Sequence, residues 1–519
     1  MEESMLNDDF VKFGWKTVKL GDFIDFVGGG TPDKKNPDYW NGDIKWASVK
    51  DVKNKYLHTT QDTITELGLK NSSSQLAIDG ELILVTRISP GKCVIAKDNI
   101  AINQDLKIVK LKADVLTNFV HYFFTAKENE FIKRSSGTTV KGIRLEEIRI
   151  IEIDLPPLPE QRAIVSKIEQ LFSELDNGIA NLKLAQEQLK VYRQAVLKKA
   201  FEGELTKKWR EQQSDLPDAG DLLEQIRRER EEGYNKKLEE WKKAVKEWED
   251  AGKKDKKPTK PKKSKETTPF TETELSNLPK GWGWIRLGNL VEEPKYGTSK
   301  KCDYNINGIG VLRIPNISDG LINDSDLKYA QFDFTEIENY RLKTGDILTI
   351  RSNGSVDLVG KCALVSTKDE KYLYAGYLIR LRPISSLINS KYLLNCLSSI
   401  DLRYQIESKA KSTSGVNNIN SGELQSLKIP ICTPPEQQFI VQEIETRLSV
   451  CDKIEQDIET NLDKAEALRQ SILKKAFEGK LLNEKELAEV RLAEDWEPAE
   501  VLLERVKAEK KASGKKGKS

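Results

Sequence analysis

The amino-acid sequence predicts an α+β protein: two α/β globular domains separated by two long antiparallel coiled-coil helices, related by a pseudo-twofold internal repeat. Three observations predict this fold. The heptapeptide LKKAFEG occurs at 197–203 and again at 473–479, and a segment of helical periodicity precedes each copy. Short β-branched runs punctuated by Gly, Asn and Pro precede those segments. A chain of 519 residues is long enough for several such units.

The repeat extends well beyond the heptapeptide. At the same offset of 276 positions and with no gap, Pro159-Glu160-Gln161 aligns with Pro435-Glu436-Gln437, Asp176 with Asp452, and Arg193-Gln194 with Arg469-Gln470. The two segments between the PEQ and LKKAFEG landmarks therefore have the same length.

Each of these segments is predicted to form one long helix. A Pro in the first turn followed by Glu is a helix start signal, and Gly203 and Gly479 mark the ends. Apolar residues alternate by four and three, which is typical of a coiled-coil seam. The seam comprises Ile164, Ile168, Leu171, Leu175, Leu182 and Leu189 in the first helix, and Ile440, Ile444, Ile454, Ile458, Leu468 and Ile472 in the second.

We expect the two helices to pair with each other across the intervening domain and to form a rigid spacer. The alternative is a bundle or solenoid repeat, although solenoid repeats recur at roughly 20 to 50 residues.

The segments before the helices also match, although more faintly. The matching pairs are GWKTVKLGDF (14–23) with GWGWIRLGNL (281–290), GELILVTR (80–87) with GDILTIR (345–351), and RIIEIDLPP (149–157) with LKIPICTPP (427–435), and GKC recurs at 91–93 and 360–362. A shared scaffold with different loops favours two heads that each recognise a different target. Gene duplication without division of labour is the alternative.

Composition excludes several classes of protein and site. The chain has 84 basic and 82 acidic side chains, so charge alone does not indicate a nucleic-acid partner. The six cysteines form no CxxC pair, which argues against a zinc site or a disulfide framework. We interpret His58 and His121 as structural and predict no metal site and no catalytic residues. GSVDLVGKC (354–362) fails the phosphate-loop pattern at Ser355 and Cys362.

No segment approaches the length of a membrane span, and the first residues lack an apolar run. These features predict a soluble, cytoplasmic protein.

The doubled order of a W…LG segment, a GELILVTR-like strand, GKC, LPPLPEQRAIVSKIEQLF and LKKAFEG resembles the DNA-specificity subunit of type I restriction-modification systems. The resemblance covers nearly the whole chain. It implies that each head is a target recognition domain that reads one half of a bipartite site in double-stranded DNA. It also implies that the paired helices fix the length of the unread spacer and dock two methyltransferase subunits, with restriction/translocase subunits added for cleavage.

The same resemblance implies a non-catalytic chain that binds no cofactor, whereas the partner subunits use S-adenosylmethionine, ATP and Mg²⁺. The expected parts are recognition domain 1 (1–156), the first helix (157–205), a charged helical extension with a Lys/Pro-rich linker (206–280), recognition domain 2 (281–433), the second helix (434–482), and a short helix with a Lys-rich tail (483–519). Residues 252–265 and the Lys-rich end are expected to be disordered.

Candidate DNA contacts are polar and basic loop residues, because Arg and Asn or Gln can read base edges while Lys holds phosphates. The candidates are Thr31, Lys34, Lys35, Arg87, Lys92, Lys133, Arg134 and Lys141 in the first head, and Thr298, Lys300, Lys301, Arg351, Asn353, Lys361, Lys409, Lys411, Asn417 and Asn418 in the second. RISPGK (87–92) and RSNGS (351–355) place an Arg after strands that we expect to be equivalent.

Two other functions stay open at this stage. One is a coiled-coil protein-interaction scaffold with two protein-binding heads. The other is a self-contained modification enzyme, which the lack of cofactor motifs makes the weaker candidate.

Overall fold

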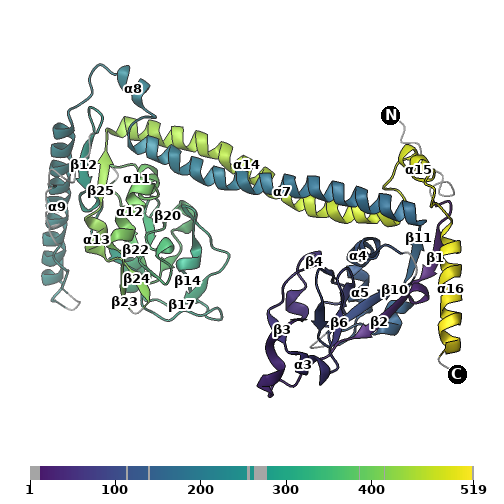
Figure 1. The fold of residues 1–519 in the computed structure, drawn as a ribbon. Coiled ribbons are helices and arrows are strands. Elements are labelled where there is room, and N and C mark those ends of the chain that lie inside the picture. The colour runs from purple at the N-terminus through teal and green to yellow at the C-terminus, as the bar shows by residue number, and fades with distance from the viewer. Residues whose placement is uncertain are drawn as a thin grey trace. The chain divides into compact units, whose positions relative to one another are not determined.

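The computed structural model describes residues 12–112, 115–137, 141–253, 257–261, 270, 278–384, 386–413 and 415–516. By its internal contacts the chain forms two units (Figure 1). Unit 1 consists of Met1–Lys183 and Ile458–Ser519, and unit 2 consists of Leu184–Asp457. Each unit therefore contains one head and a part of each long helix. We call the head of unit 1 head 1 (residues 12–156) and that of unit 2 head 2 (residues 281–433).

The described residues of head 1 form three sheets. The five-stranded sheet has the order β2-β10-β7-β8-β4, the four-stranded sheet has the order β5-β3-β9-β6, and β1 pairs with β11. The strands are β1 (Lys16–Lys19), β2 (Ile24–Gly28), β3 (Trp40–Ala47), β4 (Tyr56–Leu57), β5 (Asp62–Ile64), β6 (Gln75–Ala77), β7 (Leu82–Val85), β8 (Cys93–Ala96), β9 (Ile100–Ile102), β10 (Leu106–Leu111) and β11 (Glu152–Leu155). The helices are α2 (Leu20–Phe23), α3 (Glu66–Lys70), α4 (Thr117–Ala126), α5 (Glu128–Arg134) and α6 (Leu145–Arg149).

Strand β7 shows why this sheet is buried on both faces. Side chains alternate across a strand, so Leu82 and Leu84 enter one core while Ile83 and Val85 enter another. The first of these cores also contains the start of the first long helix and the end of the second. The head is thus attached to both helices by apolar packing.

Head 2 repeats this plan with shorter strands. Its sheets have the orders β12-β25, β13-β22-β18-β20, β17-β14-β21, β15-β16 and β19-β24-β23. The strands are β12 (Gly283–Arg286), β13 (Lys295–Tyr296), β14 (Ile309–Leu312), β15 (Ile317–Ser318), β16 (Leu321–Ile322), β17 (Lys328–Ala330), β18 (Ile347–Ile350), β19 (Ser352–Asn353), β20 (Cys362–Leu364), β21 (Leu373–Tyr374), β22 (Leu378–Leu381), β23 (Lys411–Thr413), β24 (Val416–Asn418) and β25 (Lys428–Ile431). Its helices are α10 (Phe334–Tyr340), α11 (Ser390–Leu397), α12 (Ile400–Lys409) and α13 (Ser421–Gln425).

The strands predicted from the repeated motifs are confirmed. GELILVTR and GDILTIR contain β7 and β18, and the runs before the two PEQ motifs contain β11 and β25. The pairing of β1 with β11 and of β12 with β25 joins the beginning of each head to the strand that leads into its long helix.

The two long helices are confirmed as α7 (Leu158–Phe201) and α14 (Pro434–Phe477), each of 44 residues. Both end at a glycine of positive φ, Gly203 at 77° and Gly479 at 78°. This is the left-handed conformation that terminates many helices. Inside unit 1 the first part of α7 packs with the last part of α14, and inside unit 2 the last part of α7 packs with the first part of α14. The helices therefore run antiparallel.

The seam departs from the strict alternation at two positions of α14. Ile164, Ile168, Ile440, Ile444, Ile458 and Ile472 are buried, and Leu171, Leu175, Leu182 and Leu189 are partly buried. In contrast, Ile454 is 42% exposed and Leu468 is 50% exposed. A 3.5-residue repeat drifts around a straight helix of 3.6 residues per turn. Neighbouring positions such as Arg469 and Glu455 consequently turn toward the partner helix.

The remaining helices follow the two LKKAFEG motifs: α8 (Lys207–Glu211) and α9 (Ala219–Asp250) in unit 2, and α15 (Glu484–Val490) and α16 (Ala499–Lys516) in unit 1. Leu222 of α9 is buried in the core of unit 2, and Leu502 of α16 in the core of unit 1. The region after each motif thus adds a helix to the head at which its long helix ends.

One expectation of disorder, that for the Lys-rich end, was wrong where the structure describes the chain. The Lys-rich end is helical as far as Lys516. In the Lys/Pro-rich linker, the carbonyl of Pro258 accepts a hydrogen bond of 2.9 Å from Trp241 of α9. The Lys260 ammonium also lies 5.8 Å from the centre of the Trp241 ring, so cation–π attraction contributes to this contact. The rest of the linker, 254–256 and 262–265, lies outside the described residues.

Among the described residues, no helix has both the length and the apolar character needed to cross a membrane.

Candidate nucleic-acid interface

The glutamate of the first PEQ motif holds three segments of unit 1 together. Glu160 is fully buried and accepts hydrogen bonds from Trp15 Nε1 (2.7 Å), Arg491 Nε (2.9 Å) and Trp496 Nε1 (3.3 Å). Trp15 precedes the first strand of head 1, whereas Arg491 and Trp496 follow the second LKKAFEG motif. We call these four residues the Glu160 clamp.

Unit 2 contains the counterpart, the Glu436 clamp, with different donors. Glu436 is 1% exposed, and its Oε1 accepts hydrogen bonds of 2.6 Å from both Thr206 Oγ1 and Arg210 Nη1. Arg210 also donates to the carbonyl of Gly203 (2.6 Å) and lies 5.7 Å from the centre of the Trp282 ring. Both donors come from the segment after the first LKKAFEG motif, just as Arg491 and Trp496 come from the segment after the second. Each repeat is therefore fastened to the other repeat's tail.

The glutamine of each PEQ motif ties the helix start to its own head. Gln161 donates to the carbonyl of Pro156 (2.9 Å) and accepts from the backbone N–H of Leu116 (3.0 Å), immediately before α4. Gln437 likewise donates to the carbonyl of Cys432 (2.9 Å) and accepts from Asn389 N (2.8 Å), immediately before α11. The glutamate and the glutamine of the PEQ motif therefore have the same structural role at the start of α7 and at the start of α14.

The other repeated residues cross between the long helices. In unit 1 Arg469 pairs with Asp176, and in unit 2 Arg193 Nη2 lies 2.7 Å from Asp452 and 2.8 Å from Glu455. The Arg and Asp residues shared by the two copies are thus the two halves of one pseudo-twofold contact.

The candidate DNA-reading cluster of head 1 lies beside the end of β7. Arg87 has a side chain that is 55% exposed, with Nη1 3.4 Å from Asp105 Oδ1. The Thr31 hydroxyl donates to Gln104 Oε1, and Lys107 Nζ donates to the Gln104 carbonyl (2.8 Å). Burial lowers the pKa of Lys107, and nearby Arg87 lowers it further although Asp105 opposes this. Arg and Gln side chains are the groups that pair with guanine and adenine edges.

Asn103 does not belong to this exposed cluster. Its side chain is 5% exposed, and Oδ1 accepts the backbone N–H of Asp105 (3.0 Å). This is a local turn that shapes the loop. The next residue, Gln104, is exposed beside Thr31 and is available to a ligand.

The remaining candidates of head 1 differ in their surroundings. Lys34, Lys35, Lys133 and Lys141 are exposed. Arg134 is paired with Glu130 at 2.9 Å and lies 3.8 Å from Glu147, so its charge is largely balanced.

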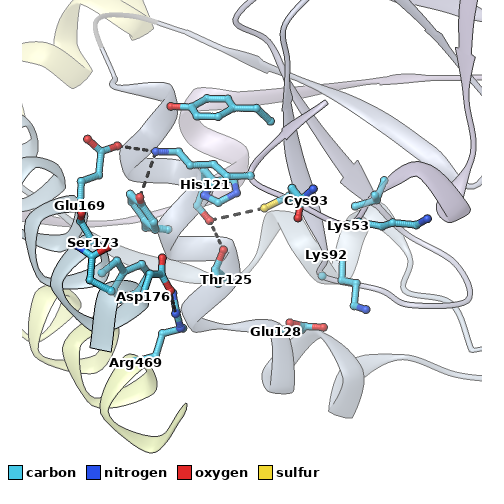
Figure 2. A pocket seen from close by; sticks show the side chains of 18 residues that line it. Lys53, Lys92, Cys93, His121, Thr125, Glu128, Glu169, Ser173, Asp176 and Arg469 are labelled. Carbon is cyan, nitrogen blue, oxygen red and sulfur yellow. Dashed lines mark hydrogen bonds and ion pairs between the residues drawn. The ribbon is translucent and has the colours of Figure 1, made fainter. Parts of the chain in front are cut away.

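Lys92 lies at a cleft of about 1000 Å³ within unit 1. Figure 2 shows Lys53 and Lys92 on one side of this cleft, and Glu169 and Asp176 of α7 with Arg469 of α14 on the other. His121 also lines the cleft, and burial lowers its pKa to about 4, so the imidazole is neutral at pH 7. The histidine cannot supply a positive charge to a phosphate there.

In head 2 the cluster forms where β19 meets β24. Arg351 stacks on Tyr296, 4.7 Å from the ring centre, and its Nε donates to Asn418 Oδ1 (3.3 Å). Asn417 donates to the Gly354 carbonyl (3.0 Å), in register with Asn353 on the neighbouring strand. The structure thus brings Arg351, Asn353, Asn417 and Asn418 together, with Lys411 of β23 opposite Asn418.

Other candidates of head 2 are held by the protein itself or lie apart. Thr298 is 5% exposed, and its carbonyl accepts the Gly376 N–H (2.7 Å). Lys300 Nζ lies 2.7 Å from Glu336 and lowers the pKa of that carboxyl through its hydrogen bond. Lys301 and Lys361 are exposed, and Lys409 is the last residue of α12.

The two strands that precede Arg87 and Arg351 are equivalent, but the two arginines do not occupy equivalent positions. The Thr86 carbonyl accepts the Ile143 N–H (2.9 Å), and in head 2 the Arg351 carbonyl accepts the Ile419 N–H (2.8 Å). Arg351 is therefore the counterpart of Thr86, one residue before Arg87. Because successive side chains of an extended chain point to opposite faces, the two arginines leave their strands in different directions.

Sequence reasoning placed neither Ile88 nor Tyr377 among the site residues. Ile88 follows Arg87 and is 57% exposed, and Tyr377 is 60% exposed where its carbonyl accepts the Arg351 N–H (2.9 Å). Apolar residues in a loop carry no periodic signal, so no pattern in the sequence marked them.

Comparison with known proteins accounts for this doubled arrangement. Residues 13–184 and 279–464 match the family described as "Type I restriction modification DNA specificity domain". The chain is 24% identical over 515 residues to the type I restriction enzyme EcoKI specificity subunit of Escherichia coli K12, covering 97% of both chains. It is also 24% identical over 514 residues to the StySPI specificity subunit of Salmonella potsdam, again covering 97% of both.

A solved structure of a type I R-M system, described in terms of complex assembly and conformational transition, shares the fold. It aligns with a TM-score of 0.61 at 18% identity, over 90% of this chain and 99% of that chain. The family match covers more than half of the sequence and includes both heads. The chain therefore belongs to the type I restriction-modification DNA-specificity family, and its role is to confer DNA specificity.

Proposed function

We propose that this chain reads one bipartite site in double-stranded DNA, with head 1 on one half and head 2 on the other. The observation that carries the proposal is that both heads are attached to the long helices in the same way, whereas the exposed polar clusters of the two heads differ. Both heads are fastened through a buried PEQ glutamate and glutamine. The cluster of head 1 presents Arg87 and Gln104, whereas that of head 2 presents an Arg351–Tyr296 stack with asparagines.

In this proposal α7 and α14 set the length of the unread gap. A helix of 44 residues is roughly 66 Å long at about 1.5 Å per residue. Charged pairs and apolar contacts join the two helices within each unit. Such a pair is stiff enough to keep two half-sites at a fixed spacing.

The long helices also offer a surface for partner subunits. In unit 2 they expose Leu184 (57%), Val191 (71%) and Val450 (57%), together with Ile454 and half of Tyr192. Exposed apolar residues on an otherwise polar helix pair suit an apolar face of another helix. We assign these exposed apolar residues to contacts with the two methyltransferase subunits. Restriction/translocase subunits complete the complex for cleavage.

On this proposal the chain itself is non-catalytic and binds no cofactor, and S-adenosylmethionine, ATP and Mg²⁺ serve the partner subunits in the cytoplasm. The name of the relatives, specificity subunits, supports this division of labour. The experiment is long-read methylation mapping in a host carrying the cognate methyltransferase subunit, with and without this chain. A single split motif that appears only with the chain supports the proposal, and unchanged methylation despite a stable complex contradicts it.

A protein-interaction scaffold would give a different binding result. Affinity of the assembled complex for a defined duplex should fall steeply with salt, because phosphate contacts release counterions. It should also depend on the base sequence of both half-sites. A complex that binds all duplexes equally would favour the scaffold.

A further inference from the structure

Ile88 occupies a backbone conformation that its residue type rarely adopts. Its φ is 73°, in the left-handed region where a branched side chain clashes with the backbone. The Ser89 N–H donates to the Arg87 carbonyl (2.9 Å), which closes a three-residue turn with Ile88 at its centre. Turns of this kind with a positive central φ are rare and strained.

The surrounding loop holds this turn in place. The Ile88 N–H donates to the Lys141 carbonyl (2.8 Å), and Arg87 forms a β-bridge with Gly142. On the other side Pro90 is buried, and the Gly91 N–H donates to the Val85 carbonyl (3.0 Å). The strain is therefore imposed from both ends of the loop. Strained positions of this kind concentrate at functional sites.

The packing of the described part of head 1 does not explain the isoleucine. Its side chain is 57% exposed, so the apolar surface faces solvent. The other non-glycine residues of positive φ among the described residues are Asn41, Lys253 and Asp319. All three are polar, and asparagine and aspartate tolerate this region comparatively well. A glycine at position 88 would remove both unfavourable features.

The neighbours of Ile88 define what the side chain could touch. Arg87 precedes it with an exposed guanidinium, Lys141 adjoins it, and Gln104 lies beside Asp105, which pairs with Arg87. In the major groove Arg pairs with guanine, Gln pairs with adenine, and an aliphatic side chain contacts the C5-methyl group of thymine. Ile88 supplies the aliphatic element that the cluster otherwise lacks.

We propose that Ile88 is a specificity-determining residue that packs on the C5-methyl group of a thymine in the half-site read by head 1. This inference rests on the proposed function. The loop holds the side chain in its strained position so that it projects from head 1 before DNA arrives, and no reorganisation of the loop is needed at binding.

The test uses the complete complex of this chain with its methyltransferase subunits and duplexes that carry the mapped motif. Each thymine of the head 1 half-site is replaced singly by deoxyuridine, which removes only the methyl group. The wild-type complex should bind one of these duplexes about 5- to 10-fold more weakly, the size expected for one buried methyl group. Ile88→Gly should bind the thymine and deoxyuridine duplexes equally, and Ile88→Val should retain the difference.

Stability separates this role from a structural one. Glycine accepts the φ of position 88 without strain, so Ile88→Gly should keep or raise the melting temperature while weakening specific binding. Asp319→Gly is the matched control, because it relieves a positive φ in head 2 and should leave the head 1 probes unaffected. A lowered melting temperature with unchanged discrimination by Ile88→Gly would overturn the proposal.

Two other results would have different meanings from a lowered melting temperature with unchanged discrimination. Equal loss of affinity by Ile88→Gly for thymine and deoxyuridine duplexes, with no deoxyuridine effect in the wild type, would contradict the methyl contact and identify a wedge between base steps. A wild-type complex without any sequence preference would instead contradict the proposed function itself.

Discussion

The Glu160 clamp and the Glu436 clamp each place a glutamate carboxylate at the start of a long helix, but different donors surround the two carboxylates. Glu160 receives two indole N–H groups and one arginine, whereas Glu436 receives one arginine and a threonine hydroxyl. Trp282, the counterpart of Trp15, has a buried Nε1 without a hydrogen-bond partner in the structure. The position of the carboxylate is therefore the shared requirement, while the number and type of its donors differ between the two clamps.

Breaking the Glu436 clamp should have the largest effect. Glu436→Ala would leave the Arg210 cation, whose side chain is 11% exposed, without its partner in the interior. Removing one member of a buried pair typically lowers the free energy of unfolding by about 3–5 kcal/mol. We expect this loss in the free energy of unfolding of unit 2, measured by chemical denaturation. Glu445→Ala is the control, because its pair with Lys391 is about half exposed on both sides and should cost less than about 1 kcal/mol.

The two tryptophans provide a sharper comparison. Trp15→Phe removes a donor to a buried carboxylate and should cost about 1.5–3 kcal/mol. Trp282→Phe removes an N–H that has no partner, so its cost should be smaller, and desolvation of that group no longer opposes folding. Denaturation of both variants beside the wild type measures the difference. Equal losses would mean that ring volume, not the hydrogen bond, determines the effect.

The contacts between the helices should matter least for stability. Arg193→Ala breaks the ion pairs with Asp452 and Glu455, whose side chains are 67% and 38% exposed. Exposed pairs of this kind contribute about 0.2–1 kcal/mol, and added salt should reduce the effect further. Lys190→Ala is the control, because it removes the solvent-exposed pair with Glu187 and leaves both ion pairs of Arg193 in place. A loss for Arg193→Ala as large as that for Glu436→Ala would show that the helix pair depends on this arginine.

The long helices could be predicted from the sequence because periodicity, an initial proline and a final glycine are local signals. The bounds of α7 and α14 lie within a few residues of the PEQ and LKKAFEG landmarks. The task of the PEQ glutamate could not be predicted, because Arg491 is 331 positions from Glu160 and Arg210 is 226 positions from Glu436. Such pairings depend on the tertiary fold, and local sequence patterns do not indicate which distant residues the fold brings together.

The sequence indicates which residue types could contact DNA, but it does not indicate which of these side chains are already paired within the protein. Arg87 and Arg351 stay candidate contacts, and the hydrogen bonds that the Thr86 and Arg351 carbonyls accept from Ile143 and Ile419 show that the two arginines are one position out of register. Lys300 looked free in the sequence but pairs with Glu336. The role proposed for Ile88 could not be predicted from the sequence, because it depends on a backbone dihedral angle.

The most direct test of the central claim is methylation mapping with a chain whose two helices are shortened symmetrically, by removing 180–183 and the equivalent 456–459. Each helix loses about 6 Å. The account predicts that both half-site sequences stay the same while the gap between them becomes shorter by about two base pairs, at roughly 3.4 Å per base pair. A stable complex that methylates the original gap would contradict the role of the helices as the spacer.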